Sequence, residues 1–492
     1  MLLTATVFLP LAGAAVVLLL LGDNARRVRL FAAAVGVADF LLAILVFARY
    51  DRDAGGFQLA DRLSSWIPQL DIQYHLAVDG LSAPLVLLTG LLGLAAIYSS
   101  WSIGTRHREY FAWLLTLQTA VMGVFMAQDF VLFFIFWELE LIPMFFLISI
   151  WGSGRKEHSA MKFLLFTFTG SAFMFVGLLT VYFSTGTFDM TQLVNMDLND
   201  LLLPSQLVFA LFFIAFAVKL PVWPVHTWLP DAHTDAPTAV SVMLAGVLLK
   251  MGGYGLIRVN VSMFPDVTAS ASTAIAVLAV ISILYGAFVT FRQTDLKRLV
   301  ANSSISHMGL RAAGHLVRGR GVGAHLAFGT DGRGDAAVQP RRGHWPPLRH
   351  GWRGVRQGAH AAHPGPGRLG GRMPFAAVAF LVAGLASLGL PATSGFAAEI
   401  MVFLGAFPAH GVLTGIATFG VLMAAGYVLW TLQRSLFGPP RERWAHLTDV
   451  SVVEAVAPAL LMVAIFAVGV YPALLSDVFS TGINDLLPRF AP

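Results

Sequence analysis

The chain has 492 residues, a net charge of +5 and a hydrophobic fraction of 57%, with only 12% of its residues charged. A soluble domain is nearer half apolar and a quarter charged, so this composition indicates a membrane protein. The sequence has no cysteine, which excludes disulfides, cysteine zinc sites and thiolate-held iron–sulfur clusters. It also has no glycine-rich nucleotide loop after a strand and no soluble domain large enough for a dinucleotide or flavin.

Long apolar runs recur along the chain, and one bilayer crossing takes about 20 such residues. The runs are continuous rather than alternating, so they predict helices and argue against strands. The first run lacks a basic segment and a clear cleavage site, so we interpret it as a helix rather than a removed signal. About twelve spans are expected, near residues 2–21, 30–49, 78–99, 111–127, 129–151, 161–184, 206–230, 238–258, 269–291, 375–408, 411–436 and 452–476.

Basic residues in the short loops indicate how these spans are oriented. They cluster after the first, third, fifth and ninth spans, whereas the loop 185–205 has none. Loops rich in Lys and Arg stay on the cytoplasmic side, so the N-terminus is expected outside. The residues that carry the pattern are Arg26, Arg27, Arg29, Arg106, Arg108, Arg155, Lys156, Arg292, Lys297 and Arg298.

Lys219 and Lys250 each lie about halfway along an apolar run. A charge at that depth costs roughly 2.5–3.5 kcal/mol on insertion scales, and such residues usually mark a path for ions or protons. The alternative is that both lysines extend to the membrane surface, but both lie deep for that. The chain between them is broken by Pro221, Pro224, Pro230 and Pro237.

Glu138 and Glu140 lie in the span 129–151 and would be about 200° apart around a regular helix, so only one can readily face a polar axis. A buried carboxylate and a buried lysine each favour the neutral form when alone, and together they restore each other's charge. Glu138 beside Lys219 would then be a switch in which separating the charges frees a proton. The alternative is a static ion pair that fixes the helix register.

A second break, at Leu390-Pro391, precedes Glu399 and is similar to the break at Leu220-Pro221. Paired discontinuous helices in the two halves of a transporter indicate its ion path. The polar residues after the first break would extend a proton entry path, or would only pack or cap the loop. Their histidine spacing is weak as a metal site. These residues are His226, Asp231 and His233.

Several long stretches resemble the family of subunit M of bacterial NADH–quinone oxidoreductase, which is subunit 4 of mitochondrial complex I. The sister subunits L and N and the cation/proton antiporters share the lysines but not the sequence between the helices. The resemblance covers most of 70–309 and 373–440. It rests on HTWLPDAHTDAPTAVSVMLAGVLLKMGGYGLIR at 226–258, FWELELIPMFFLISIWG at 136–152, SSISHMG at 303–309, LASLGLPATSGFAAEIMVFLG at 385–405, YHLAVDGLSAPLVLLTG at 74–90 and GYVLWTLQRSLFGP at 426–439.

The resemblance implies an all-α, antiporter-like transmembrane bundle. The family has about 14 helices, with two inverted five-helix repeats that each contain a broken helix. On this sequence it implies a single membrane domain, 1–492. Its parts would be N-terminal helices at 1–100, a first repeat at 111–258, a second repeat at 269–436 and a C-terminal helix and tail at 452–492.

The resemblance also implies roles for single residues. Glu138 would pair with Lys219, and Lys250 would follow on a central polar axis. His307 would open the second repeat, and Glu399 would stand where sister subunits usually have lysine. Together they would translocate protons across a bacterial inner membrane while other subunits pass electrons from NADH to quinone.

The resemblance further implies what the chain binds. It would hold no metal or cofactor, because NADH, FMN, the iron–sulfur clusters and quinone belong to other subunits. Its partners would be the lipid bilayer and the other membrane subunits, especially L and N, and not nucleic acid. Two alternatives stay open, an antiporter-like subunit of a cation/proton antiporter or membrane-bound hydrogenase, and a scaffold subunit that does not pump.

The block 311–372 breaks this pattern, because it has 11 arginines, 15 glycines and 6 histidines but no lysine, isoleucine or serine. No window of it could enter a bilayer or bury a core. It could be a basic loop that binds lipid headgroups or RNA, or a disordered insertion. We favour a pair of compensating frameshifts in a GC-rich gene, because the sequence on both sides stays in family register. A genuine block would break the axis between His307 and Glu399.

Peptide mass spectrometry across 300–380, on protein purified from its native membrane, tests this interpretation. Apolar peptides from another reading frame are the expected result, and they would restore the missing helices of the second repeat. Arginine-rich peptides that match 311–372 would contradict it and favour a scaffold subunit.

Overall fold

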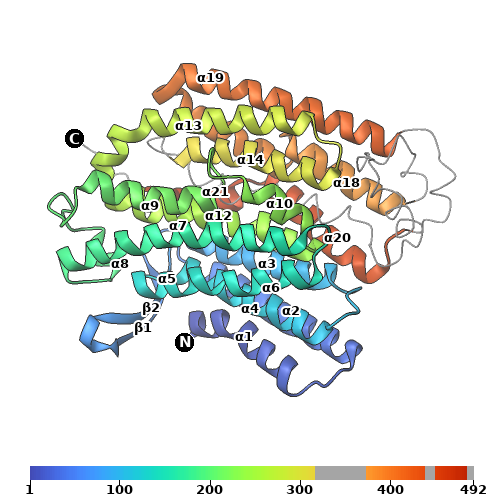
Figure 1. The fold of residues 1–492 in the computed structure, drawn as a ribbon, viewed down its shortest axis with the longest axis horizontal. Helices are drawn as coiled ribbons and strands as arrows, with labels where there is room; N and C mark the ends of the chain where they lie inside the picture. The colour runs from blue at the N-terminus through green and yellow to red at the C-terminus, as the bar shows by residue number, and fades with distance from the viewer. Residues whose placement is uncertain (316–372, 438–448, 485–492) are drawn as a thin grey trace.

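The computed structural model describes residues 1–315, 373–437 and 449–484, which form a bundle of long helices running roughly side by side (Figure 1). Ten helical stretches in this part of the chain are long and apolar enough to cross a membrane, so the predicted helical membrane bundle is confirmed. The elements are α1 (Leu2–Leu19), α2 (Ala25–Arg49), β1 (Gln58–Ile67), η1 (Pro68–Leu70), β2 (Ile72–Val78), α3 (Ser82–Ser99), α4 (His107–Met126), α5 (Phe130–Leu139), α6 (Leu141–Trp151), α7 (Lys156–Thr185), α8 (Met190–Leu193), α9 (Ser205–Lys219), α10 (Trp228–Asp235), α11 (Thr238–Met243), η2 (Leu244–Leu248), α12 (Leu249–Gly255), η3 (Leu256–Val261), α13 (Pro265–Phe291), α14 (Leu296–His315), α18 (Pro374–Ser387), α19 (Ser394–Leu436), α20 (Val452–Val470) and α21 (Ala473–Asn484).

The N-terminal helices α1 and α2 and the later helices α13, α14 and α19 lie on opposite sides of the bundle (Figure 1). α1 to α4 pack on one another, and α13 packs on α14 and α19. The continuous run from α11 through η3 lies between these groups, in contact with α3, α9 and α14, and it is buried along its whole apolar window. α19 is two helices joined across a kink at His410, which agrees with the two predicted spans that meet there.

The buried run from α11 to η3 departs from a regular helix. η2 and η3 are π-helical stretches that flank α12, the segment that carries Lys250. Stretches of π-helix inside α-helices are rare and are found mostly at functional sites. Hydropathy predicts the span but gives no signal for this irregularity.

The polar loop between α2 and α3 contains a β-hairpin, although no strands were expected. β1 and β2 pair antiparallel, with Arg62 opposite His75 and Leu63 opposite Tyr74. The expectation was wrong for this loop because it was drawn from the apolar spans, and the hairpin lies outside them. Because the basic-loop pattern predicts that this end faces outside, we call it the outer end.

α14 is a further helix that hydropathy missed, because its sequence is rich in polar residues. These residues bond to the backbone within the helix: Asn302 Nδ2 donates to the Arg298 carbonyl at 2.8 Å, and Ser303 Oγ to the Val300 carbonyl at 2.8 Å. Ser306 Oγ donates across to the Ile283 carbonyl of α13 at 2.9 Å. A polar helix is therefore accommodated among apolar ones without unpaired groups at these positions.

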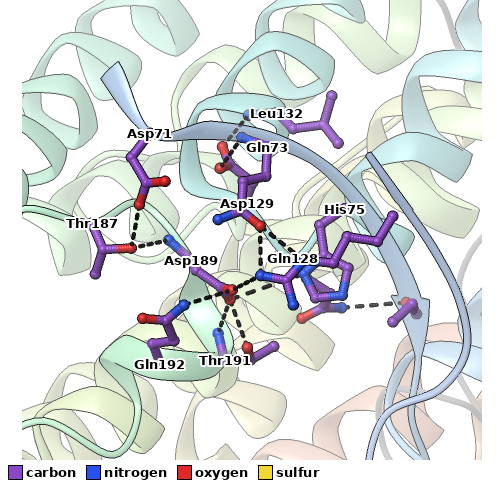
Figure 2. A network of polar contacts seen from close by, with 12 residues as sticks. Asp71, Gln73, His75, Gln128, Asp129, Leu132, Thr187, Asp189, Thr191 and Gln192 are labelled. Atoms are coloured by element: carbon purple, nitrogen blue, oxygen red, sulfur yellow. Dashed lines mark hydrogen bonds and ion pairs between the residues drawn. The ribbon is translucent and has the colours of Figure 1, made fainter. Parts of the chain in front are cut away.

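Two aspartates begin helices at the outer end and lie close together in a polar network (Figure 2). Asp129 precedes α5, and its carboxylate accepts from the backbone N–H groups of Val131, Leu132 and Gln73 at 2.9, 3.1 and 3.0 Å. Asp189 precedes α8 and accepts from Arg62 of β1, the two side chains being 3.1 Å apart. Both aspartates are buried.

Backbone hydrogen bonds join the same loops to the hairpin. Gln128 N donates to the His75 carbonyl, Phe130 N to the Phe188 carbonyl, and Met190 N to the Gln128 carbonyl, each at 2.9 Å. The hairpin is thus fixed to the first residues of α5 and α8. Since α5 leads directly to Glu138 and Glu140, the outer network sets the position of that helix.

Burial raises the pKa of Asp129 from 3.8 to about 6, against the effect of its three N–H donors. The native state therefore binds this proton more tightly than the unfolded state does. The stabilisation is present below about pH 4 and is lost as the pH rises through about 6. Neighbouring charged groups are Asp189, Arg62 and His75, and burial lowers the pKa of His75.

We expect the hairpin amides to exchange hydrogen faster at pH 7 than at pH 4.5, after correction for intrinsic rates. Asp129→Asn keeps a capping oxygen and cannot ionise, so this variant should show a smaller pH dependence. Hydrogen-exchange mass spectrometry on the purified protein measures both. Equal pH dependence in the two proteins would show that Asp129 does not titrate in this range.

Candidate functional site

Lys219 is the last residue of α9, at the predicted break, and its side chain is only 2% exposed. The negative end of the helix dipole favours a cation there. The ammonium lies 5.1 Å from the ring centre of Trp137 and 5.9 Å from that of Phe163. Trp228 closes the break by donating from Nε1 to the Val218 carbonyl at 2.9 Å. Lys219 is therefore held in an aromatic, water-poor pocket.

The ion pair of Lys219 is with Glu140, whereas the sequence suggested Glu138. Glu140 is fully buried and stands between α5, which ends at Leu139, and α6, which begins at Leu141. Glu140 keeps helical backbone angles, so the two glutamates point to different sides of the helix, as expected. The side that faces Lys219 is that of Glu140.

Glu138 also lies within electrostatic range of Lys219, beside Ser171 of α7. Its side chain is partly exposed in the isolated subunit, while that of Glu140 is not. Lys219 therefore has two carboxylates near it. Glu140 forms the ion pair, and Glu138 is a second group that could take its place. With two carboxylates in range, the Lys219 ammonium can move from one to the other and keep a negative charge beside it throughout.

Lys250 lies on α12 and is fully buried. Its Nζ donates to the Ala245 carbonyl in η2. In a regular α-helix that carbonyl would be bonded by the N–H four residues later, so the π-helical stretch changes which groups are available to the lysine. The Lys250 ammonium is thus held by a local irregularity of its own helix.

The helices of the two lysines approach closely at Gly252. A Cβ at this position would lie 2.7 Å from Leu220 N and 2.8 Å from the Phe216 carbonyl, so only glycine fits. Leu220 follows Lys219 directly, and Gly252 is two residues from Lys250. The close approach therefore brings the ends of the two lysine-bearing segments together.

The three polar residues after the first break are distributed over the inner end, opposite the hairpin. Asp231 pairs with Lys162 of α7 at 2.7 Å, and the ring of His226 lies 4.9 Å from that of Tyr285. His233 is fully buried in α10, and its carbonyl accepts from Ser241 Oγ at 3.1 Å. These contacts support loop packing for all three residues. No cluster of metal-ligating side chains occurs in the described ranges.

His307 and Glu399 lie in the second half, on α14 and α19. His307 lines a cavity of about 50 Å³ between α14, α18 and α19, together with Ser303, Tyr427 and Thr431. Gly389, at a φ of +68°, lies directly against the Glu399 carboxylate, and a side chain there would collide with it. The predicted second break is confirmed between α18 and α19. Most of the block 311–372 lies outside the described residues, so the path between these two groups is not traced.

Comparison with known proteins agrees with this arrangement. Residues 127–328 match the family model described as "NADH:quinone oxidoreductase/Mrp antiporter, TM". NADH-quinone oxidoreductase subunit M of Rhodobacter capsulatus is 36% identical, with 99% of this chain and 97% of that protein covered. The chain belongs to the subunit M family of NADH-quinone oxidoreductase.

Solved structures agree with the subunit M fold. A chain of respiratory complex I from Thermus thermophilus superposes with a TM-score of 0.84 at 28% identity, covering 99% of this chain and all of that one. A chain of the Mrp complex from Dietzia sp. reaches a TM-score of 0.83 at 20% identity, covering 99% and 98%. The second likeness shows a shared fold, and the antiporter alternative is not favoured over subunit M.

Two buried polar pairs of this subunit were missed in the sequence. Asp79, just before α3, pairs with Arg258 of η3 at 2.6 Å. Asp39, inside α2, accepts from Gln118 Nε2 of α4 at 2.5 Å. Asp79 and Asp39 are each a single acidic residue within an apolar stretch. An isolated acid of this kind indicates a buried polar partner, and this was the signal that the sequence offered.

A double-mutant cycle on the two glutamates tests whether they share Lys219. Glu138→Gln and Glu140→Gln should each leave one carboxylate for the ammonium. The double variant leaves none, so we expect a coupling of about 1–3 kcal/mol beyond the sum of the single effects. Thermal unfolding of the purified complex measures it, and additive effects would show that only one glutamate serves this lysine.

Proposed function

We propose that this subunit translocates protons within the membrane part of an NADH–quinone oxidoreductase, through Lys219, Lys250 and their acidic partners. The observation that carries the proposal is the buried ion pair between Lys219 and Glu140 at a broken helix. A buried pair is costly to maintain, because removing two charges from water opposes their attraction. The neighbouring Lys250 gives this pair a group to exchange charge with.

The charge state of the pair depends on whether the two side chains stay in contact. While Lys219 touches Glu140, each charge stabilises the other. If the pair opens, the ammonium is left in an aromatic pocket and favours release of its proton, and the carboxylate favours uptake of one. Glu138 supplies a second resting place for the cation during this exchange.

Lys250 is suited to take the released proton. Its segment touches the end of α9 at Gly252, and its irregular helix leaves a carbonyl that holds the ammonium. A charge on Lys250 would repel one on Lys219, so the two lysines would be charged alternately. From Lys250, His307 and Glu399 would continue the path in the second half.

The remaining roles follow from family membership. We propose that other membrane subunits, with subunits L and N as the neighbours, surround this chain in a bacterial inner membrane. NADH, FMN, iron–sulfur clusters and quinone would be bound elsewhere in the complex, in keeping with the lack of cysteine here. Electron transfer would then act on this subunit only through charge displacement along the membrane.

Lys219→Ala in the assembled complex is the direct test. We expect loss of most NADH-driven proton pumping and of the coupled quinone reductase rate, because the ammonium that opens and closes the pair is gone. Acidification by membrane vesicles and NADH oxidation measure the two rates.

Lys156→Ala is the matched control, because this lysine only donates to the Ile150 carbonyl at the inner surface. It should leave both rates near those of the unmodified complex. Normal rates in an assembled Lys219→Ala complex would refute an active role for Lys219.

A further inference from the structure

Polar side chains recur along the central helix from Lys250 to its outer end, although the Lys250 Nζ itself bonds back to the Ala245 carbonyl. Lys250, Tyr254 and Arg258 are spaced four residues apart, so they lie on one side of the helix. Arg258 Nε lies 3.1 Å from the Tyr254 hydroxyl, and that hydroxyl donates to the Phe125 carbonyl at 3.4 Å. The other residues between Lys250 and Arg258 are buried and mostly apolar.

Arg258 stands at the outer end of this face. Its guanidinium is 4% exposed and lies 5.0 Å from the ring centre of Phe57, which is itself 39% exposed. One aromatic ring of the outer loop thus covers the charge. A proton that left Lys250 along Tyr254 would meet Arg258 before it met external water.

Asp79 holds the guanidinium in this place. Its Oδ2 accepts from Arg258 at 2.6 Å, and its Oδ1 accepts from the N–H groups of Leu81 and Ser82 at 3.1 and 2.9 Å. Both carboxylate oxygens are therefore occupied. The next residue, Gly80, contacts the backbone of α21 so closely that no Cβ would fit, which packs the C-terminal helix against this end.

A guanidinium differs from the other polar groups on this face in one respect. It stays protonated at any physiological pH and can neither accept a proton nor release one. A fixed arginine charge in a narrow polar path raises an electrostatic barrier to protons and cations. A hydroxyl such as that of Tyr254 has no such effect and can relay a proton.

We propose that Arg258, held by Asp79, is the outer seal of the Lys250 compartment, a fixed positive charge that stops protons from leaving Lys250 directly to the outside. This rests on the proposed function, in which Lys250 carries protons. With the direct route closed, a proton on Lys250 has to move laterally toward the second half. Arg258 is thus a positioning and barrier residue that does not itself carry protons.

The test measures passive proton permeability of the whole complex in liposomes. A potassium diffusion potential draws protons inward without NADH, and an internal dye reports their entry. The variant Asp79→Asn/Arg258→Gln removes both charges together, so it leaves no uncompensated buried charge. We expect protons to enter roughly tenfold faster than with the unmodified complex, because a charge barrier of about 1.4 kcal/mol is lost.

Arg62→Gln is the matched control, because it removes another outer arginine that lies off the Lys250 face, and it should stay as tight as the unmodified complex. Asp79→Asn alone keeps the guanidinium but removes the carboxylate that holds it, so it should leak less than the double variant. If the double variant does not assemble, Asp79→Asn/Arg258→Met replaces it. Methionine is apolar and similar in length to arginine, and we expect the same leak.

A double variant as tight as the unmodified complex would overturn the seal. So would an equal leak from Asp79→Asn alone, because the guanidinium is still present there. The assay uses no turnover, so its outcome is independent of whether Lys219 carries protons during catalysis. The two proposals therefore fail separately.

Discussion

The ion pair between Lys219 and Glu140 is the interaction on which the rest of the site depends. Neither charge is stable alone in this water-poor interior, so each needs the other or a replacement. The broken helix α9 places the lysine, and the helical turn that joins α5 to α6 places the glutamate. A pair that is costly to bury and has a second carboxylate nearby can change state with little net free energy.

The surrounding packing keeps this exchange local. Gly252 lets the helix of Lys250 touch the end of α9, and Asn260 donates to the Phe209 carbonyl at 2.9 Å, which joins the same two helices farther out. At the outer end Asp129 fixes the start of α5 to the hairpin. The lysines and glutamates are thus held between helices whose ends are fixed.

Hydropathy predicted most of the spans, because a span needs only a long apolar run. The positions of the prolines predicted both helix breaks, because proline cannot continue a regular helix. Periodicity shows that Glu138 and Glu140 face different sides of their helix, but the choice of Glu140 depends on which side faces α9, and that follows from the packing of the helices. The hairpin and α14 were missed because their residues are polar and are satisfied by local backbone bonds. Hydropathy also gives no signal for the π-helical stretches around Lys250.

In the proposed mechanism the pair at Lys219 opens during turnover, and its carboxylate then takes up a proton. Infrared difference spectroscopy of the complex, with carbon-13 glutamate and with or without NADH and quinone, observes this directly. We expect a protonated-carboxyl band that appears during turnover, shifts with the label and is lost in Glu140→Gln. A turnover spectrum in which Glu140→Gln changes no such band would contradict it.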